Sequence, residues 1–235
     1  MVTLVLLPGM DGTGSLFSDF VSALGSEFET ILVHYPDDEP LAYTELEGVV
    51  RAFLPCDRPF ILLGESFSGP IAISLSVSAP PGLIGLILCC SFAINPWPLL
   101  GVFRWLVPFA LVKRVPIALL SKCLLGRFSS GPLRSSLSKA LDRVSAKALK
   151  ARLSAALETD VLAHLRRLRV PILYLRASDD YLVPRAASER IRRSAPQVRV
   201  AELKAPHFLL QAMPRAAAAV VSEFSREVAK ALNNP

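Results

Sequence analysis

The sequence predicts an α/β fold in which a mostly parallel sheet of about six strands carries helices on both faces. Three observations lead to this prediction. Short, nearly continuous apolar runs recur along the chain, as strands that are buried on both faces require. Segments with helical patterns separate these runs. Hydrophobic residues make up 52% and charged residues 20% of the 235 residues, which suits a single domain with a sizeable core.

The predicted strands and helices alternate along the chain. We expect strands over residues 2–7, 30–34, 60–63, 83–90, 170–175 and 198–203. We expect helices over residues 15–24, 43–54, 66–79, 185–194 and 214–232. Because a helix that joins two strands lets them run in the same direction, this order of elements favours a parallel sheet.

The N-terminus and the cysteines indicate the compartment. The first apolar run leads directly into glycines and lacks the basic segment and the cleavage site of a signal peptide. No uninterrupted apolar run reaches the ~18 residues of a membrane span. The four cysteines show no zinc-ligand spacing, which favours buried, reduced thiols. We therefore expect a cytoplasmic protein without a metal site.

One long segment interrupts the alternation. Residues 96–159 contain helical patterns, several prolines and no predicted strand. We expect this segment to form a helical cap that is inserted into a core made of residues 1–95 and 160–235. Within it, residues 97–157 contain eleven Lys and Arg residues and a single acid, Asp142. The whole chain carries a net charge of only +6, so the rest of the chain is net acidic.

A candidate nucleophile follows the third predicted strand. The run Gly64-Glu65-Ser66-Phe67-Ser68-Gly69 joins an apolar strand directly to a helix through small side chains. A serine on such a turn is lifted above the edge of the sheet, and the tight turn admits only small neighbours. The usual pattern is Gly-x-Ser-x-Gly, and Ser68 stands where the second glycine is usual. We interpret Ser66 as the nucleophile; the simpler alternative is a serine that caps the helix.

A nucleophilic serine needs a general base, and histidine is the usual one because its pKa lies near neutral pH. Of the three histidines, only His207 lies in a loop just past a predicted strand and also follows a plausible acid in the chain. The imidazole in turn needs a carboxylate to orient it. The turn after the strand over residues 170–175 contains Asp179 and Asp180, and either could serve.

A glycine-rich loop follows the first predicted strand. Its residues, Pro8-Gly9-Met10-Asp11-Gly12-Thr13-Gly14, could aim backbone N–H groups at a developing oxyanion. The alternative is a nucleotide-binding loop, and Asp37 and Asp38 stand about where a ribose-binding acid would. The order of the glycines is wrong for that alternative. We therefore favour the oxyanion interpretation, which implies no cofactor.

Together these motifs resemble the α/β-hydrolase superfamily over nearly the whole chain, including its order of serine, acid and histidine. The run Ala177-Ser178-Asp179-Asp180-Tyr181-Leu182-Val183-Pro184 is similar to the superfamily's Gly-x-x-Asp-x-x-Val-Pro, which favours Asp180 as the acid. The resemblance implies that the backbone N–H groups of Met10 and Phe67 form an oxyanion hole, with Gly9 beside the substrate. The sequence departs from the superfamily in lacking the usual first hairpin and in having Pro8 where a histidine is common.

The resemblance implies hydrolysis of a carboxylic ester through an acyl-enzyme, without a cofactor, on a small-molecule acyl ester. An apolar cap suits an acyl chain, so Trp97, Phe103 and Trp105 are candidate substrate-binding residues. The basic residues of the cap could attract an anionic lipid surface or an acidic acyl-carrier partner, and we expect no nucleic acid. The alternatives are a thioesterase, a methyl-ester esterase of carrier-bound substrates, a lysophospholipase, or a catalytically weak ligand-binding protein of the same fold.

Overall fold

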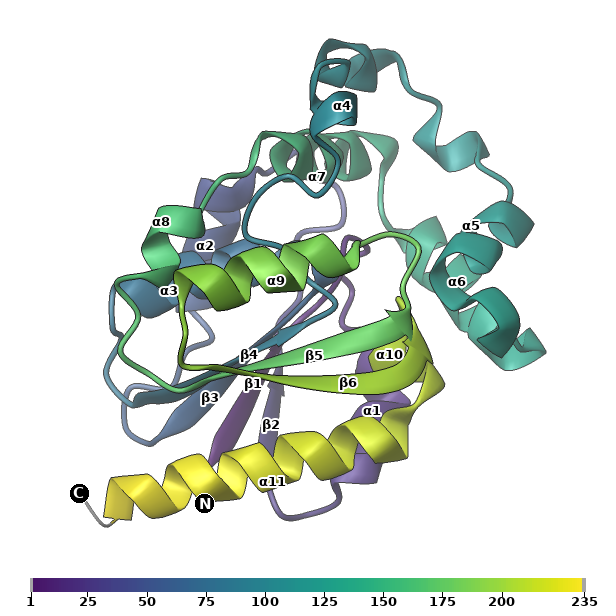
Figure 1. The fold of residues 1–235 in the computed structure, drawn as a ribbon. Coiled ribbons are helices and arrows are strands. Elements are labelled where there is room, and N and C mark those ends of the chain that lie inside the picture. The colour runs from purple at the N-terminus through teal and green to yellow at the C-terminus, as the bar shows by residue number, and fades with distance from the viewer. Residues whose placement is uncertain (1, 234–235) are drawn as a thin grey trace.

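The computed structural model describes residues 2–233, which contain one sheet of six parallel strands (Figure 1). The strands lie in the order β2-β1-β3-β4-β5-β6, so the chain moves outward from β1 in both directions. The strands are β1 (Thr3–Leu7), β2 (Glu29–Leu32), β3 (Phe60–Glu65), β4 (Leu83–Cys89), β5 (Ile172–Asp179) and β6 (Val198–Pro206). The predicted α/β fold with a parallel sheet is confirmed.

Helices cover both faces of this sheet because alternate residues of a strand point to opposite sides. In β1, Leu4 and Leu6 pack against one helical layer, and Val5 and Leu7 pack against the other. The first layer comprises α1 (Ser18–Leu24), α10 (Leu209–Ala212) and α11 (Pro214–Asn233). The second comprises α2 (Tyr43–Arg51), α3 (Gly69–Val77), α8 (Leu162–Leu165) and α9 (Arg185–Ser194). Among residues 2–233, no helix is both long and apolar enough to cross a membrane.

Several strand ends differ from the predicted bounds, and the ends of β2 and β5 show why. The second strand ends at Leu32, and His34 lies beyond it, where its Nδ1 donates to the Thr13 carbonyl at 2.5 Å. Strand β5 continues to Asp179, well past the predicted end at residue 175. Its last residues are polar but still pair with β6, the edge strand, where side chains reach solvent. Apolar runs therefore mark the centres of strands better than their ends.

The segment between β4 and β5 is helical. Its elements are α4 (Pro98–Gly101), 3-10 turns over Arg104–Phe109 and Val112–Arg114, α5 (Ile117–Leu125), a 3-10 turn over Gly126–Phe128, α6 (Gly131–Arg143) and α7 (Ala146–Glu158). At its base, Ile94 and Asp160 form an antiparallel bridge, and the Asn95 N–H donates to the Thr159 carbonyl at 2.9 Å. The segment therefore leaves and re-enters the core at one place. We call residues 96–159 the insert, and its role as a cap stays a proposal.

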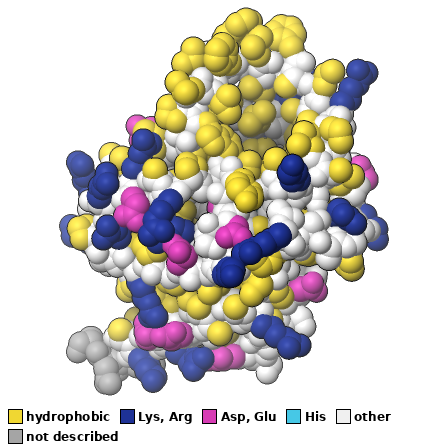
Figure 2. Space-filling model, turned by 45° about the vertical axis from the view of Figure 1, so that its right-hand side comes forward, with side chains coloured by type: hydrophobic (Ala, Val, Ile, Leu, Met, Phe, Trp, Pro, Cys, Tyr) yellow, Lys and Arg dark blue, Asp and Glu magenta, His cyan; other side chains and the backbone are white. Residues whose placement is uncertain are grey.

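The insert lies beside the carboxyl ends of the strands (Figure 1). Just past β6, the Phe208 N–H donates to the Leu124 carbonyl of α5 at 3.1 Å, which ties the insert to this edge of the sheet. Hydrophobic side chains gather on the upper part of the molecule, where the insert lies, and surround a hollow there (Figure 2). The carboxyl edge of the sheet and the insert thus enclose the space in which the sequence-predicted residues meet.

Candidate active site

Ser66 begins a sharp turn between β3 and α3. Its φ angle is 47°, in the left-handed region that residues other than glycine rarely adopt. Two glycines make the turn possible. A Cβ atom at Gly64 would lie 2.8 Å from the Ser68 carbonyl oxygen, and one at Gly69 would lie 1.7 Å from Ser91 Oγ. The turn holds Ser66 in a strained conformation at the end of the sheet, where strain is characteristic of functional positions.

Ser68, which stands in the place of the usual glycine, connects the turn to its surroundings. The side chain is fully buried, and its hydroxyl donates to the carbonyl of Pro8, the first residue after β1. The Tyr35 hydroxyl donates to Ser68 Oγ at 2.6 Å. Burial raises the pKa of the Tyr35 phenol well above its ordinary value, so the phenol remains a donor. The departure from the usual motif thus adds two hydrogen bonds instead of disturbing the turn.

His207 and Asp180 complete a chain of hydrogen bonds with Ser66. His207 Nε2 lies 2.8 Å from Ser66 Oγ, and His207 Nδ1 lies 2.8 Å from Asp180 Oδ2. Both side chains are buried, and each follows the carboxyl end of a different strand. The N–H groups of Leu182 and Val183 donate to Asp180 Oδ1 at 2.8 Å each, which fixes the carboxylate. A hydroxyl, an imidazole and a carboxylate in this order can transfer the hydroxyl proton to the imidazole.

Asp179, the other candidate acid, takes no part in the hydrogen bonds that join Ser66, His207 and Asp180. Its Oδ2 lies 2.8 Å from Arg127 Nη2, in the 3-10 turn of the insert after α5. The structure thus brings Asp180, and not its neighbour, to His207.

The loop after β1 brings Met10 to the same place. Met10 and Phe67 both line the cavity next to Ser66, as Gly9 does. Phe67 lies in the first turn of a helical segment, where backbone N–H groups have no partner within the helix. The loop also contains Gly12 and Gly14, which have φ angles of 72° and 68°. The two residues whose N–H groups the resemblance implies therefore line the same cavity as Ser66.

Arg152 of α7 holds this loop from the side of the insert. Its side chain is 1% exposed, and Nη1 donates to the carbonyls of Met10 at 2.9 Å and Asp11 at 2.8 Å. Nη2 donates to the Pro36 carbonyl at 2.9 Å. A Cβ atom at Gly12 would lie 2.5 Å from Nη1, so the guanidinium needs a glycine there. From the sequence, Arg152 was counted among the basic residues of the cap. The signal that marks it out is its spacing with the buried residues of α7, which are Ala148, Leu149, Ala155 and Ala156.

Glu65 is a second buried residue that the sequence did not single out. It precedes Ser66, is 4% exposed and lines the same cavity. Gln211 Nε2 donates to its Oε1 at 2.9 Å. Burial, aided by the nearby charge of Asp11, raises the pKa of the Glu65 carboxyl to about 7, although the bond from Gln211 opposes the shift. A titratable group of this kind beside the serine is characteristic of functional sites.

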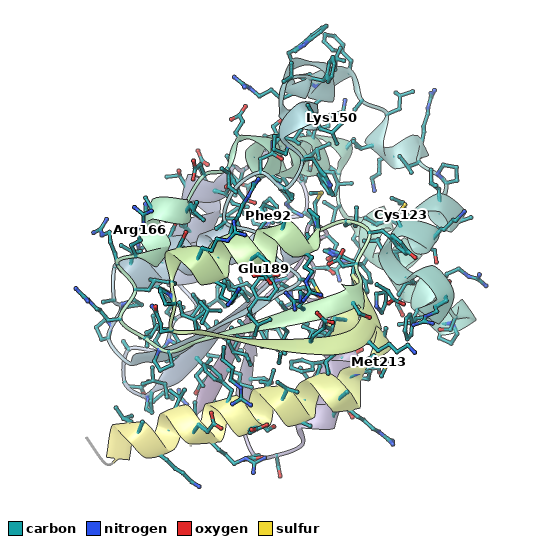
Figure 3. All side chains as sticks on the ribbon, viewed as in Figure 1. Phe92, Cys123, Lys150, Arg166, Glu189 and Met213 are labelled. Carbon is teal, nitrogen blue, oxygen red and sulfur yellow. The ribbon has the colours of Figure 1, made fainter. Side chains whose placement is uncertain are left out.

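A cavity of about 390 Å³ opens onto Ser66 and His207. Phe92, after β4, and Cys123, from α5, both line it and are labelled in Figure 3. The rest of the lining contributed by the insert is almost entirely apolar: Pro96, Trp97, Val115, Leu119, Leu120, Leu124, Leu137, Leu141, Leu149, Leu153, Ala156 and Leu157. Such a lining suits a hydrocarbon group attached to a reacting carbonyl.

Of the three aromatic residues predicted to bind substrate, only Trp97 lines this cavity. Phe103 and Trp105 lie outside it and are 56% and 65% exposed. They lie at the beginning of the 3-10 turn Arg104–Phe109, a segment with Pro108 inside it and no long helical face to bury. The sequence shows that these side chains are apolar but not which way such short turns point them.

The remaining histidines take no part in the site. His34 bonds to the loop after β1, and His164 Nδ1 lies 3.4 Å from Ser74 Oγ on the second helical layer. The cysteines differ from one another, since Cys89 and Cys90 are buried but Cys56 is exposed, against the prediction of uniformly buried thiols. In the part of the chain that the structure describes, no three His, Cys, Asp or Glu side chains are grouped so that they could hold a metal ion.

Comparison with known proteins identifies the family. The model of the alpha/beta hydrolase family matches residues 4–220. Phytyl ester synthase 1 of Arabidopsis thaliana is 35% identical over 129 residues, which are 50% of this chain and 18% of that protein. Polyketide synthase ThaQ of Burkholderia thailandensis is 27% identical over 85% of this chain and 10% of its own length, so the chain spans less than a fifth of either relative. An esterase from Exiguobacterium antarcticum has the same fold, with a TM-score of 0.82 at 14% identity over 96% of this chain and 92% of that one. The chain belongs to the alpha/beta hydrolase family.

Proposed function

We propose that the protein hydrolyses carboxylic esters through an acyl-enzyme, with Ser66 as the nucleophile, His207 as the general base and Asp180 as the residue that orients the base. The observation that carries the proposal is the strained Ser66, whose hydroxyl lies 2.8 Å from an imidazole held by a buried carboxylate. Membership of a hydrolase family supports it.

The proposed reaction has two halves. His207 takes the proton of Ser66, whose oxygen attacks the ester carbonyl, and the imidazolium then gives that proton to the departing alcohol. Water repeats the path in the second half and releases the acid. The backbone N–H groups of Met10 and Phe67 hold the oxyanion in both halves, which is worth ~3 kcal/mol per donor.

The cavity supports a proposal for the substrate class. Its leucine-rich lining favours a hydrocarbon acyl chain, and the reacting carbonyl then lies at Ser66. We propose that the insert forms this lining as a cap. The match to a protein named as a phytyl ester synthase agrees with an apolar ester as substrate.

The test is covalent labelling by a fluorophosphonate probe together with hydrolysis of p-nitrophenyl esters of graded chain length. Ser66→Ala should abolish both. The matched control is Ser22→Ala, because Ser22 is an exposed serine of α1. Labelling and hydrolysis that survive in the Ser66→Ala variant would show that another group carries the reaction.

A further inference from the structure

Exposed apolar side chains are concentrated in one part of the insert. Of the thirteen large hydrophobic residues that are exposed in the described chain, eleven lie between residues 99 and 119. They are Leu99, Leu100, Val102, Phe103, Trp105, Leu106, Phe109, Leu111, Val115, Ile117 and Leu119. We call residues 99–119 the insert tip. Figure 2 shows hydrophobic side chains covering the upper part of the molecule, where the insert lies.

The size of this apolar surface calls for a partner. Monomeric soluble proteins rarely expose large contiguous apolar patches, because each such patch is hydrated at a cost in free energy. Leu99 is 82% exposed, and Phe109 is 75% exposed. Trp105 adds an indole ring, which is a side chain that favours the boundary between lipid and water.

The charge around the tip selects the kind of partner. From Trp97 to Leu141 the chain contains seven Lys and Arg residues and no Asp or Glu. Arg114 and Lys122 are exposed and take part in none of the ion pairs between described residues. Exposed apolar side chains interspersed along the chain with Lys and Arg match the composition of segments that lie in the interface of an anionic membrane.

The tip also borders the cavity of the active site. Val115 and Leu119 are exposed residues of the tip and line the cavity that reaches Ser66. A neighbouring hollow of about 400 Å³ includes Lys113 and Ile117 of the tip and shares part of its wall with that cavity. An apolar path therefore leads from the exposed surface to the nucleophile.

We propose that the insert tip docks on the surface of an anionic lipid bilayer and that the active site draws its acyl ester from that bilayer. The docking itself is independent of the reaction, whereas the uptake of the acyl ester from the bilayer rests on the function proposed above. Apolar side chains of the tip enter the boundary of the bilayer, and the Lys and Arg side chains remain at the level of the head groups.

A second copy of the chain fits the same surface less well. Two copies that meet tip to tip would bring like charges together, because both tips carry Lys and Arg and no acid. Facing like charges destabilise an interface. An anionic bilayer satisfies the apolar and the charged side chains at once.

The experiment measures co-sedimentation of the full chain with vesicles. The Ser66→Ala variant is used so that no lipid is consumed, with vesicles of phosphatidylcholine alone or of an equimolar mixture with phosphatidylglycerol. We expect binding to the mixed vesicles that weakens as salt is added. Trp105→Ala combined with Phe109→Ala should weaken binding by about tenfold or more. Arg114→Glu combined with Lys122→Glu should weaken it by a similar factor.

Two matched controls separate docking from general effects. Leu232→Ala removes an exposed apolar side chain of α11, far along the chain from the tip. Arg166→Glu combined with Arg167→Glu reverses two exposed charges after α8. Both controls should bind like the parent, and circular dichroism should show the same fold for every variant.

The outcomes are distinguishable. No binding to mixed vesicles, or equal loss in the controls, overturns the docking proposal even if the wild-type chain reacts with a fluorophosphonate. Two further results would also overturn the docking proposal. One is a dimer in solution that Trp105→Ala combined with Phe109→Ala abolishes. The other is binding to an acidic acyl-carrier protein, and not to vesicles, that the same double substitution abolishes. Vesicle binding without fluorophosphonate labelling of the wild-type chain would leave docking supported and the proposed hydrolase function wrong.

Discussion

Polar side chains behave in opposite ways at the end of the sheet and in the insert. At the carboxyl ends of the strands, Glu65, Asp180 and His207 are buried and hydrogen-bonded to defined partners. In the insert, all of which the structure describes, Arg152 alone of the Lys and Arg residues is buried. Buried charges need fixed partners, so their positions report on geometry, whereas exposed charges report on what the protein meets. The sheet thus positions the candidate catalytic groups, and the insert lines the cavity beside them.

The largest expected effect concerns the buried polar side chains at the end of the sheet. Asp180→Asn should lower kcat for a p-nitrophenyl ester by about 10⁴-fold, because the imidazole loses the carboxylate that sets its tautomer. Asp179→Asn is the matched control and should stay near the wild-type rate, since Asp179 pairs with Arg127. Equal losses in both variants would show that the acid is wrongly assigned.

The substitution Arg152→Met tests whether the one buried basic residue of the insert is needed for activity as well as for stability. Three carbonyls would lose their donor, so stability should fall by about 4 kcal/mol. Because Met10 would be released, kcat should fall more than KM changes. Thermal unfolding and steady-state kinetics measure the two effects, with the exposed Arg134→Met as control. Loss of stability with unchanged kcat would assign Arg152 a structural role only.

Glu65→Gln tests the buried carboxyl through the pH dependence of stability. Its pKa in the folded protein is raised from 4.5 to about 7, so the fold binds the proton more tightly than the unfolded chain does. Stability from this group is present below pH ~4.5 and is lost as pH rises through ~7, by about 3 kcal/mol in all.

The free energy of unfolding of the Glu65→Gln variant should therefore rise relative to that of the wild type as the pH increases from ~4.5 to ~7. Urea unfolding at several pH values measures the difference, with the exposed Glu39→Gln as control. A difference between the Gln variant and the wild type that is constant with pH would contradict the raised pKa.

The smallest effect concerns the turn itself. Gly69→Ala should destabilise the protein by about 2 kcal/mol, because the new Cβ atom meets Ser91 Oγ and the backbone must shift. Gly131→Ala is the control, since a Cβ atom there meets nothing within 4 Å. Combining Gly69→Ala with Ser91→Gly should recover part of the loss. Equal thermal stability of the two single variants would contradict the close packing at Gly69.

The candidate nucleophile and base could be predicted because the sequence patterns that mark them involve only neighbouring residues. Ser66 lies between an apolar strand and a helix, and His207 directly follows a strand, so a few neighbouring residues place each of them. Such signals failed for Arg152, whose partners lie more than a hundred residues away in the loop after β1. They failed also for Phe103 and Trp105, because an apolar residue in a short turn can face a cavity or solvent equally well.

By itself the sequence determined the parallel α/β fold, since apolar runs and helical periods depend on neighbouring residues alone. It also determined which serine and histidine could meet, because the carboxyl ends of parallel strands share one edge. A motif resemblance favoured Asp180 over Asp179, but the residues themselves left both open until the tertiary structure placed Asp180 at His207 and Asp179 at Arg127. Only the tertiary structure showed that Arg152 is buried under the loop and that the insert tip is exposed. These outcomes depend on distances between segments far apart in the chain, which no local pattern contains.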